Sequence, residues 1–324
     1  MTTAPDPVHV PAVHRSRPRS LVGASVVVAA LLVLPLVFLL LQARQVGWAQ
    51  LSSLLFRHLT GTLLWNTVRL SVVVTAASAV IGTAAAWFIE RTDLPGRRWW
   101  AVLVVIPVAI PDFVVSFGWV SVAPSLQGFG GAALVMTLAV YPLVYLPVAA
   151  SFRGADPGQE EVARSLGLGR ARTFFRVTVA QARPAILGGC LLVALALLAE
   201  YGAFEILRYQ TFTTEIFTEF QVGDIPAASG LSLVLVLLGL VLLTADGFGR
   251  GGGRTSRSGP LVARARQPRR LGRGTVPVVA GFVVLAGLAV GVPFGTLLYW
   301  LIRGGRTTLP AAASLSSAAW HSAG

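Results

Sequence analysis

The sequence contains no lysine, since all 26 basic residues are arginine. A P-loop requires a lysine after its glycines, and Schiff-base chemistry requires a lysine amine, so both are excluded. The single cysteine, Cys190, excludes an internal disulfide framework and a cysteine-rich metal site. Charged residues make up 12% of the chain, whereas soluble domains have about 25%. With 55% hydrophobic residues and a mean hydropathy of +0.73, the chain has too little polar surface for a water-soluble globule.

Long apolar stretches make up much of the sequence. A bilayer core about 30 Å thick requires roughly 20 residues of helix, and seven stretches are long enough. They predict an all-α integral membrane protein with about seven transmembrane helices. Five stretches are uncharged, one contains Asp112 and one runs into Glu200. The stretches are 21–41, 70–89, 99–122, 131–152, 184–204, 227–245 and 275–302.

The arginines predict the orientation of these spans. They crowd the N-terminal tail and every second link, including six in the link 153–183 and eight between Arg250 and Arg273. Because cytoplasmic links carry the excess of arginine, the N-terminus is predicted to lie in the cytoplasm and the C-terminus outside. The net charge of +13 is therefore a topology signal and not a sign of nucleic-acid binding.

The last part of the chain resembles the first. In each, a basic run precedes an apolar helix with one proline, Pro35 or Pro293, and a tryptophan, Trp65 or Trp320, follows. Weak helical repeats of this kind are common in transporters. We expect a cytoplasmic tail (1–20), a first half of six helices (21–248), a Gly/Arg-rich linker (249–274) and the start of a truncated second repeat (275–324). The alternative is a seven-span protein with a coincidental similarity.

The link 153–183 contains the most informative pattern. Asp156-Pro157 is a good helix start, because proline suits the first turn and acids are stabilised by the helix dipole there. Gly167 and Gly169 interrupt the helix, and an amphipathic piece containing Phe174 and Val177 leads back to the membrane. The pattern predicts two short helices at a sharp glycine-rich bend, a shape that suits insertion into a groove on a partner. The alternative is a surface helix that merely joins two spans.

The same link resembles a known family motif. Glu161-Val162-Ala163, Gly167 and Val177 are similar to the EAA loop, E-A-A-x3-G-x9-I-x-L-P, of permease subunits of binding-protein-dependent ABC importers. Val162 and Ala180 depart from the motif, in which alanine and proline stand at these places. The resemblance implies a permease without catalysis of its own, whose loop docks on separate ATPase subunits that use ATP.

Further motifs extend the resemblance across nearly the whole chain. Asn66-Thr67-Val68-Arg69-Leu70-Ser71 resembles the start of the family's core, and Ile106–Pro111 resembles its proline-broken third span. Segments 200–204 and 208–214 are similar to the ferric-iron branch, in which two halves are fused in one chain. The resemblance implies iron as cargo, with thiamine, polyamine or sulfate as alternatives. It also implies two ATPase subunits, an extracytoplasmic solute-binding protein, a second permease half and a bacterial plasma membrane.

Five residues are candidates for a translocation pathway or gate. An ionised Asp112 at the centre of a helix would cost about 2.5–3.5 kcal/mol, so it is expected to face protein or a water-filled cavity. Pro107 and Pro111 free backbone carbonyls at the same depth, and Glu200 and Tyr201 lie at the outer end of the fifth span. The alternative places Asp112 near the outer interface or in a hydrogen bond to a neighbouring helix.

The remaining patterns limit the chemistry. The four histidines are scattered without metal-ligand spacing, so no metal site and no bound cofactor are predicted. Phe212, Ile216 and Phe220 recur at helical spacing and predict an interfacial helix. The competing class is a membrane-embedded enzyme that uses Asp112 and Glu200 as an acid/base pair. In such an enzyme the link 153–183 would have no role.

Overall fold

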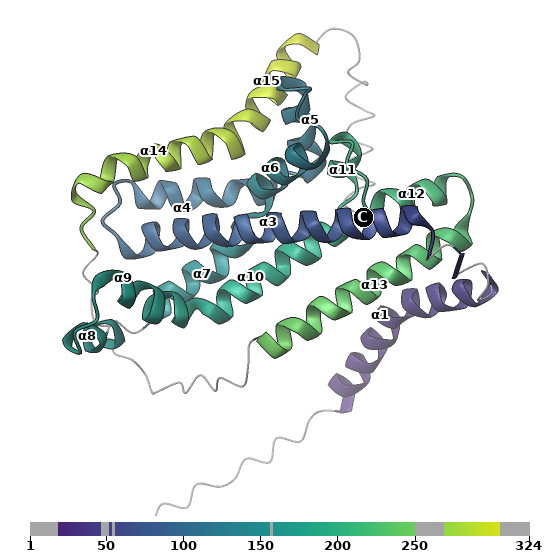
Figure 1. The fold of residues 1–324 in the computed structure, drawn as a ribbon, viewed down its shortest axis with the longest axis horizontal. Helices are drawn as coiled ribbons and strands as arrows, with labels where there is room; N and C mark the ends of the chain where they lie inside the picture. Colours follow the sequence, from purple (N-terminus) through teal and green to yellow (C-terminus); the bar gives the residue numbers. More distant parts are fainter. Residues whose placement is uncertain (1–18, 47–51, 54–55, 156–157, 250–268, 305–324) are drawn as a thin grey trace, which may run out of the picture.

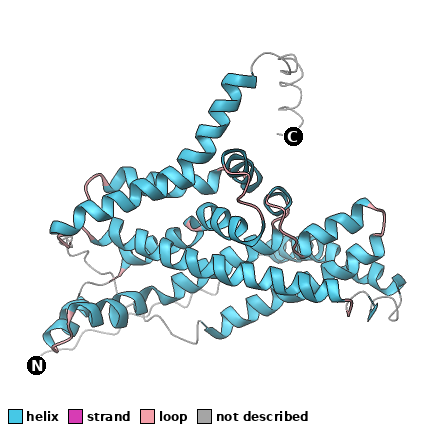
Figure 2. Cartoon of the chain, turned by 45° about the horizontal axis from the view of Figure 1, so that its top comes forward, coloured by secondary structure: helices cyan, strands magenta, loops and turns pink. Residues whose placement is uncertain are grey.

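The computed structural model describes residues 19–46, 52–53, 56–155, 158–249 and 269–304. These residues are almost entirely helical and contain no strand, with one isolated β-bridge between Thr92 and Arg269 (Figure 2). The all-α fold expected from the hydropathy is therefore confirmed. The N-terminal tail, most of the linker, the Asp156-Pro157 helix start and Trp320 lie outside the described residues.

Six helices are long and apolar enough to cross a membrane, and a bent helix pair brings the number to seven if it counts as one span. They agree with the seven predicted stretches, although several helices extend beyond them. The six continuous spans are α1 (Arg19–Val46), α3 (His58–Arg91), α6 with α7 (Gly128–Val140, Pro142–Gly154), α9 through α10 (Arg170–Thr173, Val179–Ala199), α13 (Ile225–Gly249) and α14 with α15 (Thr275–Ala286, Val292–Gly304).

The centre of the molecule is a tightly packed group of three helices, α3, α7 and α10 (Figure 1). Two glycines allow this approach. A Cβ on Gly82 would lie 2.9 Å from Val144 Cβ, and one on Gly189 would lie 2.7 Å from Val144 Cα. Small residues at such contacts are how membrane helices gain close van der Waals packing. Tyr141 and Phe152 of the same region are fully buried.

The predicted span 99–122 is bent by 96° rather than continuous. Helix α4 (Arg97–Val105) continues as the 3₁₀ turn η1 (Ile106–Ala109), and α5 (Asp112–Val122) then leaves in a new direction. Pro107 and Pro111 explain the break, because proline lacks the N–H that the helix requires and holds the preceding residue extended. Ile110, before Pro111, is indeed extended. Asp112 accordingly begins a helix instead of lying inside one.

The fifth predicted span is also shifted. Helix α10 ends at Ala199, so Glu200 lies beyond its end and not inside the span. The helical path begins before the predicted Pro184, through α9 and the π-turn η2 (Phe174–Thr178), and α10 continues through that proline.

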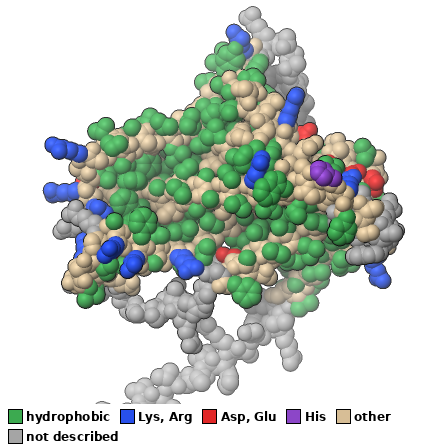
Figure 3. Space-filling model, viewed as in Figure 1, with side chains coloured by type: hydrophobic (Ala, Val, Ile, Leu, Met, Phe, Trp, Pro, Cys, Tyr) green, Lys and Arg blue, Asp and Glu red, His purple; other side chains and the backbone are tan. Residues whose placement is uncertain are grey.

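The bundle has two chemically distinct ends. One end, called the α8 end, carries α8 (Gly158–Ser165), α9, the end of α3 and the start of α14 (Figure 1). The opposite end, called the α12 end, carries α11 (Gly202–Ile206) and α12 (Phe212–Gln221). Hydrophobic side chains cover much of the face between the two ends (Figure 3). This band is the surface expected to contact lipid.

Candidate functional site

The glycine-rich bend at the α8 end has the geometry predicted from the sequence. Two short helices, α8 and α9, meet at a turn centred on Gly167, which has a φ of +83°. The N–H of Gly167 donates to the carbonyl of Arg164 at 3.0 Å, and that of Leu168 donates to the carbonyl of Ala163 at 3.1 Å. This pair of bonds is the Schellman motif that closes a helix with a left-handed residue, which explains why glycine stands there.

The motif residues divide between the surface and the interior. Glu161 and Val162 are exposed, with 59% of Val162 accessible, whereas Ala163 is 6% exposed and packs inward. Val177 is half-buried in η2. Leu166 is 77% exposed at the tip of the turn. We call α8, the turn 166–169 and α9 the α8 corner; it presents an apolar tip flanked by a carboxylate.

A residue that the sequence reasoning missed, Glu160, fastens this corner to the bundle. Its carboxylate pairs with Arg91 of α3 at 3.1 Å and accepts a hydrogen bond of 3.0 Å from the Thr178 hydroxyl. A weaker contact of 3.6 Å joins it to Arg164 within α8. Glu160 carries no motif signature, and its main partner lies far away in the sequence, so neither spacing nor composition indicates it.

The second group of predicted residues lies beyond the other end of α10. A helix of 21 residues is about 30 Å long, so this group is separate from the α8 corner. Glu200 Oε1 accepts a 2.7 Å hydrogen bond from the N–H of Ala203 and so caps α11, while the Glu200 carbonyl accepts one of 2.6 Å from Thr213. The Tyr201 ring packs on Phe217 with centroids 4.2 Å apart.

Helix α11 packs against α5, which brings Asp112 and Glu200 to one place. A Cβ on Gly202 would lie 3.1 Å from the Cβ of Phe113, next to Asp112 in the chain. The same Cβ would lie 3.7 Å from Oε1 of Glu200, and both carboxylates are half-buried. Pro107 is buried and Pro111 is exposed at the same break. Within the described residues no group of three or more His, Cys, Asp or Glu side chains is placed to hold a metal ion.

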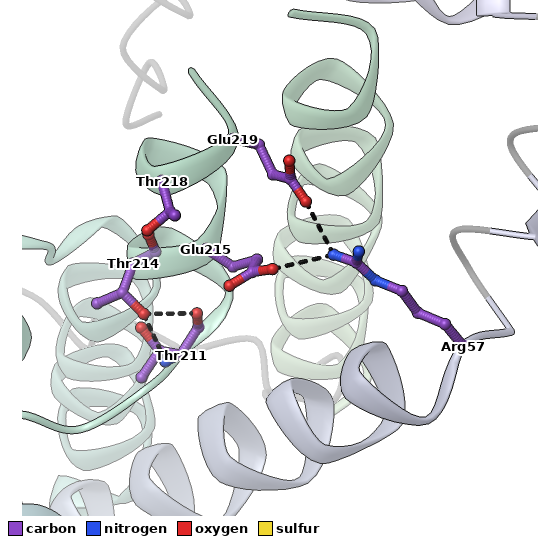
Figure 4. A network of polar contacts seen from close by, with 6 residues as sticks. All are labelled: Arg57, Thr211, Thr214, Glu215, Thr218 and Glu219. Carbon is purple, nitrogen blue, oxygen red and sulfur yellow. Dashed lines mark hydrogen bonds and ion pairs between the residues drawn. The ribbon is translucent and has the colours of Figure 1, made fainter. Parts of the chain in front are cut away.

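Helix α12 is held in place by apolar and polar contacts, and its position at the membrane interface stays a prediction. Of its apolar stripe, Phe212 is buried and Phe220 is 61% exposed. Phe212 is fully buried against Leu63 and Leu231. Arg57 pairs through one nitrogen with both Glu215 and Glu219, each at 3.0 Å, as Figure 4 shows. These acids therefore already have a cationic partner within the chain.

The segment Asn66-Thr67 holds the residues before α12 in place. The Thr67 hydroxyl accepts a 3.1 Å hydrogen bond from the N–H of Phe212, and the Asn66 amide donates one of 3.1 Å to the Gln210 carbonyl. The Tyr209 hydroxyl donates to the Asn66 carbonyl at 3.1 Å. Residues that carried the family resemblance thus tie α3 to the α12 end.

Comparison with known proteins defines the class of protein to which the chain belongs. Residues 78–245, about half of the chain, match the family model described as "Binding-protein-dependent transport system inner membrane component". The chain belongs to this family of membrane transport components. Its named relatives are transport permeases and not enzymes, so the family argues against the acid/base alternative for Asp112 and Glu200.

Two individual relatives within this family show what the chain is similar to. The chain is 38% identical over 287 residues to "Fe(3+)-transport system permease protein FbpB 2" of Haemophilus influenzae, a match that covers 88% of this chain and 56% of that one. It is 28% identical to the sulfate transport system permease protein CysT of Salmonella typhimurium over 67% of this chain and 86% of that one. The chain thus spans little more than half the length of the Fe(3+) relative.

A solved structure has the same fold. The MetNI methionine ABC transporter, in inward-facing conformations, superposes with a TM-score of 0.52 at 16% identity, covering 60% of this chain and 98% of that one. The match supports the helical permease architecture.

Proposed function

We propose that this chain is the permease component of an ABC importer, that it contributes walls to the translocation pathway, and that its α8 corner docks on an ATPase subunit. The observation that carries the proposal is the exposed corner. The exposed residues are Glu161 and Val162 of α8 and Leu166 of the Schellman turn that follows it. The opposite side of α8 is bound to the bundle by the Arg91–Glu160 ion pair. An apolar tip of this shape fits a groove on a partner.

Ferric iron is the proposed cargo. The support is the 38% identity to a relative named for Fe(3+) transport, against 28% for a sulfate permease. Sulfate is an anion, whereas Asp112 and Glu200 would favour a cation, so the half-buried acids agree with iron. Thiamine and polyamines remain the alternatives with cationic cargo.

The proposal also includes the orientation of the chain in the membrane and the other subunits of the importer. The α8 end lies in the cytoplasm and the α12 end faces the solute-binding protein, with the N-terminus cytoplasmic in a bacterial plasma membrane. Residues 21–248 form one permease half, 249–274 form a linker and 275–324 begin a second half. Two ATPase subunits and a second permease half complete the importer.

Capture of the ATPase tests the docking role. Gly167→Pro removes a left-handed residue and an N–H donor from the corner. Gly223→Pro is the matched control, because Gly223 has a φ of +85° and donates its N–H to Phe220 at the other end of the molecule. We expect the detergent-solubilised wild type and the Gly223 variant to retain the co-expressed ATPase and the Gly167 variant to lose it. Equal capture by all three would contradict the proposal.

Cargo identity is tested separately. Uptake of radiolabelled ferric iron, sulfate and thiamine is compared in proteoliposomes that contain the assembled importer with its solute-binding protein. We expect ATP-dependent accumulation of iron alone. Accumulation of sulfate or thiamine instead would contradict the choice of iron without affecting the permease role.

A further inference from the structure

Arg91, the last residue of α3, has an unusual environment for an arginine. Its side chain is 5% exposed, and its guanidinium lies 5.4 Å from the ring centroid of Phe152 on α7. The charged partner is Glu160 of α8, at 3.1 Å. Within the described part of the chain, Nε and Nη2 of Arg91 have no hydrogen-bond partner. The guanidinium charge therefore depends on one carboxylate for its compensation.

That carboxylate connects three elements through one oxygen. Glu160 Oε1 faces Arg91 of α3 and also accepts the hydrogen bond of Thr178, which is 4% exposed and stands directly before α10. Since Phe152 belongs to α7, the side chains around the Arg91–Glu160 pair join α8 to all three central helices.

The other contacts given for α8 reach the segments that follow it in the chain, up to the first turn of α10, and none of them reaches α3. Helix α8 packs on α9 and η2, which belong to the same link. Its second polar tie, from the Gln181 amide to Gln159 at 2.8 Å, is exposed and uncharged. A displacement applied to α8 reaches α3 most directly through the buried ion pair, because a buried pair resists separation far more than a solvated contact does.

We propose that Arg91 and Glu160 are positioning residues that transmit movement of the α8 corner to the central helices α3, α7 and α10. The proposal rests on the proposed ATPase docking of the corner. The exposed face of α8 then docks on the ATPase, and its buried face transmits the movement to the central helices. Loss of the pair should uncouple ATP hydrolysis from transport while the ATPase stays bound.

A fold-preserving variant separates these two steps. Removing one partner leaves a buried unpaired charge, whereas neutralising both is far milder. Arg91→Met with Glu160→Gln keeps similar volumes, and the new amide oxygen can still accept from Thr178. Arg91→Lys keeps the charge. Glu90→Gln is the matched control, because Glu90 is also near the end of α3 but pairs at 2.6 Å with Arg153, whose side chain is 60% exposed.

Two readouts are taken on the complete importer: ATPase co-purification, and iron uptake in proteoliposomes with ATP. We expect the double variant to capture the ATPase like the wild type and to transport at least about tenfold more slowly, a loss within the usual range of coupling between sites. Arg91→Lys should recover most of the uptake, and Glu90→Gln should keep it.

Two results would overturn the inference. Normal uptake by the double variant would show that the pair transmits nothing. Loss of ATPase capture would show that the pair serves docking instead. Failure of the wild type itself to capture the ATPase would instead reject the proposed function, and the inference with it.

Discussion

Gly118 of α5 faces Thr296 of α15 so closely that a Cβ on the glycine would lie 2.7 Å from the threonine hydroxyl and 3.2 Å from Pro293 Cα. Thr296 is 7% exposed, and its hydroxyl already donates within α15. The contact joins the second helix of the broken span to the last described helix. The apolar segment 272–303 therefore packs on the bent pair through a place where only glycine fits.

Gly118→Leu should consequently destabilise the protein by about 1–3 kcal/mol, since an overpacked side chain forces backbone to move. The thermal unfolding midpoint of the detergent-solubilised protein measures this. Gly281→Leu on α14 is the control, because nothing lies within 4 Å of a Cβ placed there. Equal midpoints for the two variants would contradict the close packing of α5 on α15.

The turn at Gly167 predicts a ranked series of substitutions. Asparagine tolerates a positive φ, whereas a β-branched valine does not, and a non-glycine residue in this region costs roughly 1–2 kcal/mol. We expect ATPase capture to fall in the order glycine, asparagine, valine at position 167. A valine variant that captures as much ATPase as the asparagine variant would show that the Schellman turn is not needed for docking.

The double ion pair at Arg57 predicts a local effect at the α12 end. Arg57→Met would leave Glu215 and Glu219, both 16% exposed, as like charges on adjacent turns. Loss of two charge-assisted bonds should weaken the docking of α12 by about 1–3 kcal/mol.

Hydrogen exchange over 212–221 measures that weakening, and α12 amides should exchange faster while those of α10 stay unchanged. Arg44→Met, at an exposed arginine near the end of α1, is the control. Unchanged exchange in α12 would contradict a structural role for Arg57.

Glu200 has a capping role and a proposed pathway role that substitutions can separate. Glu200→Gln keeps an oxygen for the N–H of Ala203, whereas Glu200→Ala removes the cap at a cost of about 1 kcal/mol. We expect both variants to lose iron uptake and only the alanine variant to lose thermal stability. Normal uptake by the glutamine variant would remove the Glu200 charge from the pathway.

Much of this fold follows from hydropathy and from the positions of prolines and glycines. Apolar length predicted the spans because a bilayer selects for it. The break at Pro107 and Pro111, and the turn at Gly167, follow from the backbone limits of those residues. Such features depend on residues that are close together in the chain, so they can be predicted from the sequence alone.

Features made by distant pairs could not be predicted in this way. Glu160 and Glu161 are adjacent acids with the same propensities, and only the position of Arg91 in space distinguishes them. Phe212 belongs to an amphipathic stripe that fits a membrane interface equally well, and its burial depends on packing against Leu63 of α3. Directly after the end of α10 at Ala199, the carbonyl of Glu200 likewise accepts a hydrogen bond from Thr213, a residue of α12.

The most direct test of the account is photo-crosslinking from the tip of the α8 corner. A photoreactive phenylalanine analogue replaces Leu166, which is 77% exposed, or Val222, which is 72% exposed at the α12 end. The account predicts a crosslink to the ATPase subunit from position 166 and none from position 222. Crosslinks from position 222 and none from position 166 would contradict it, because the partner that supplies ATP energy would then lie at the wrong end of the molecule.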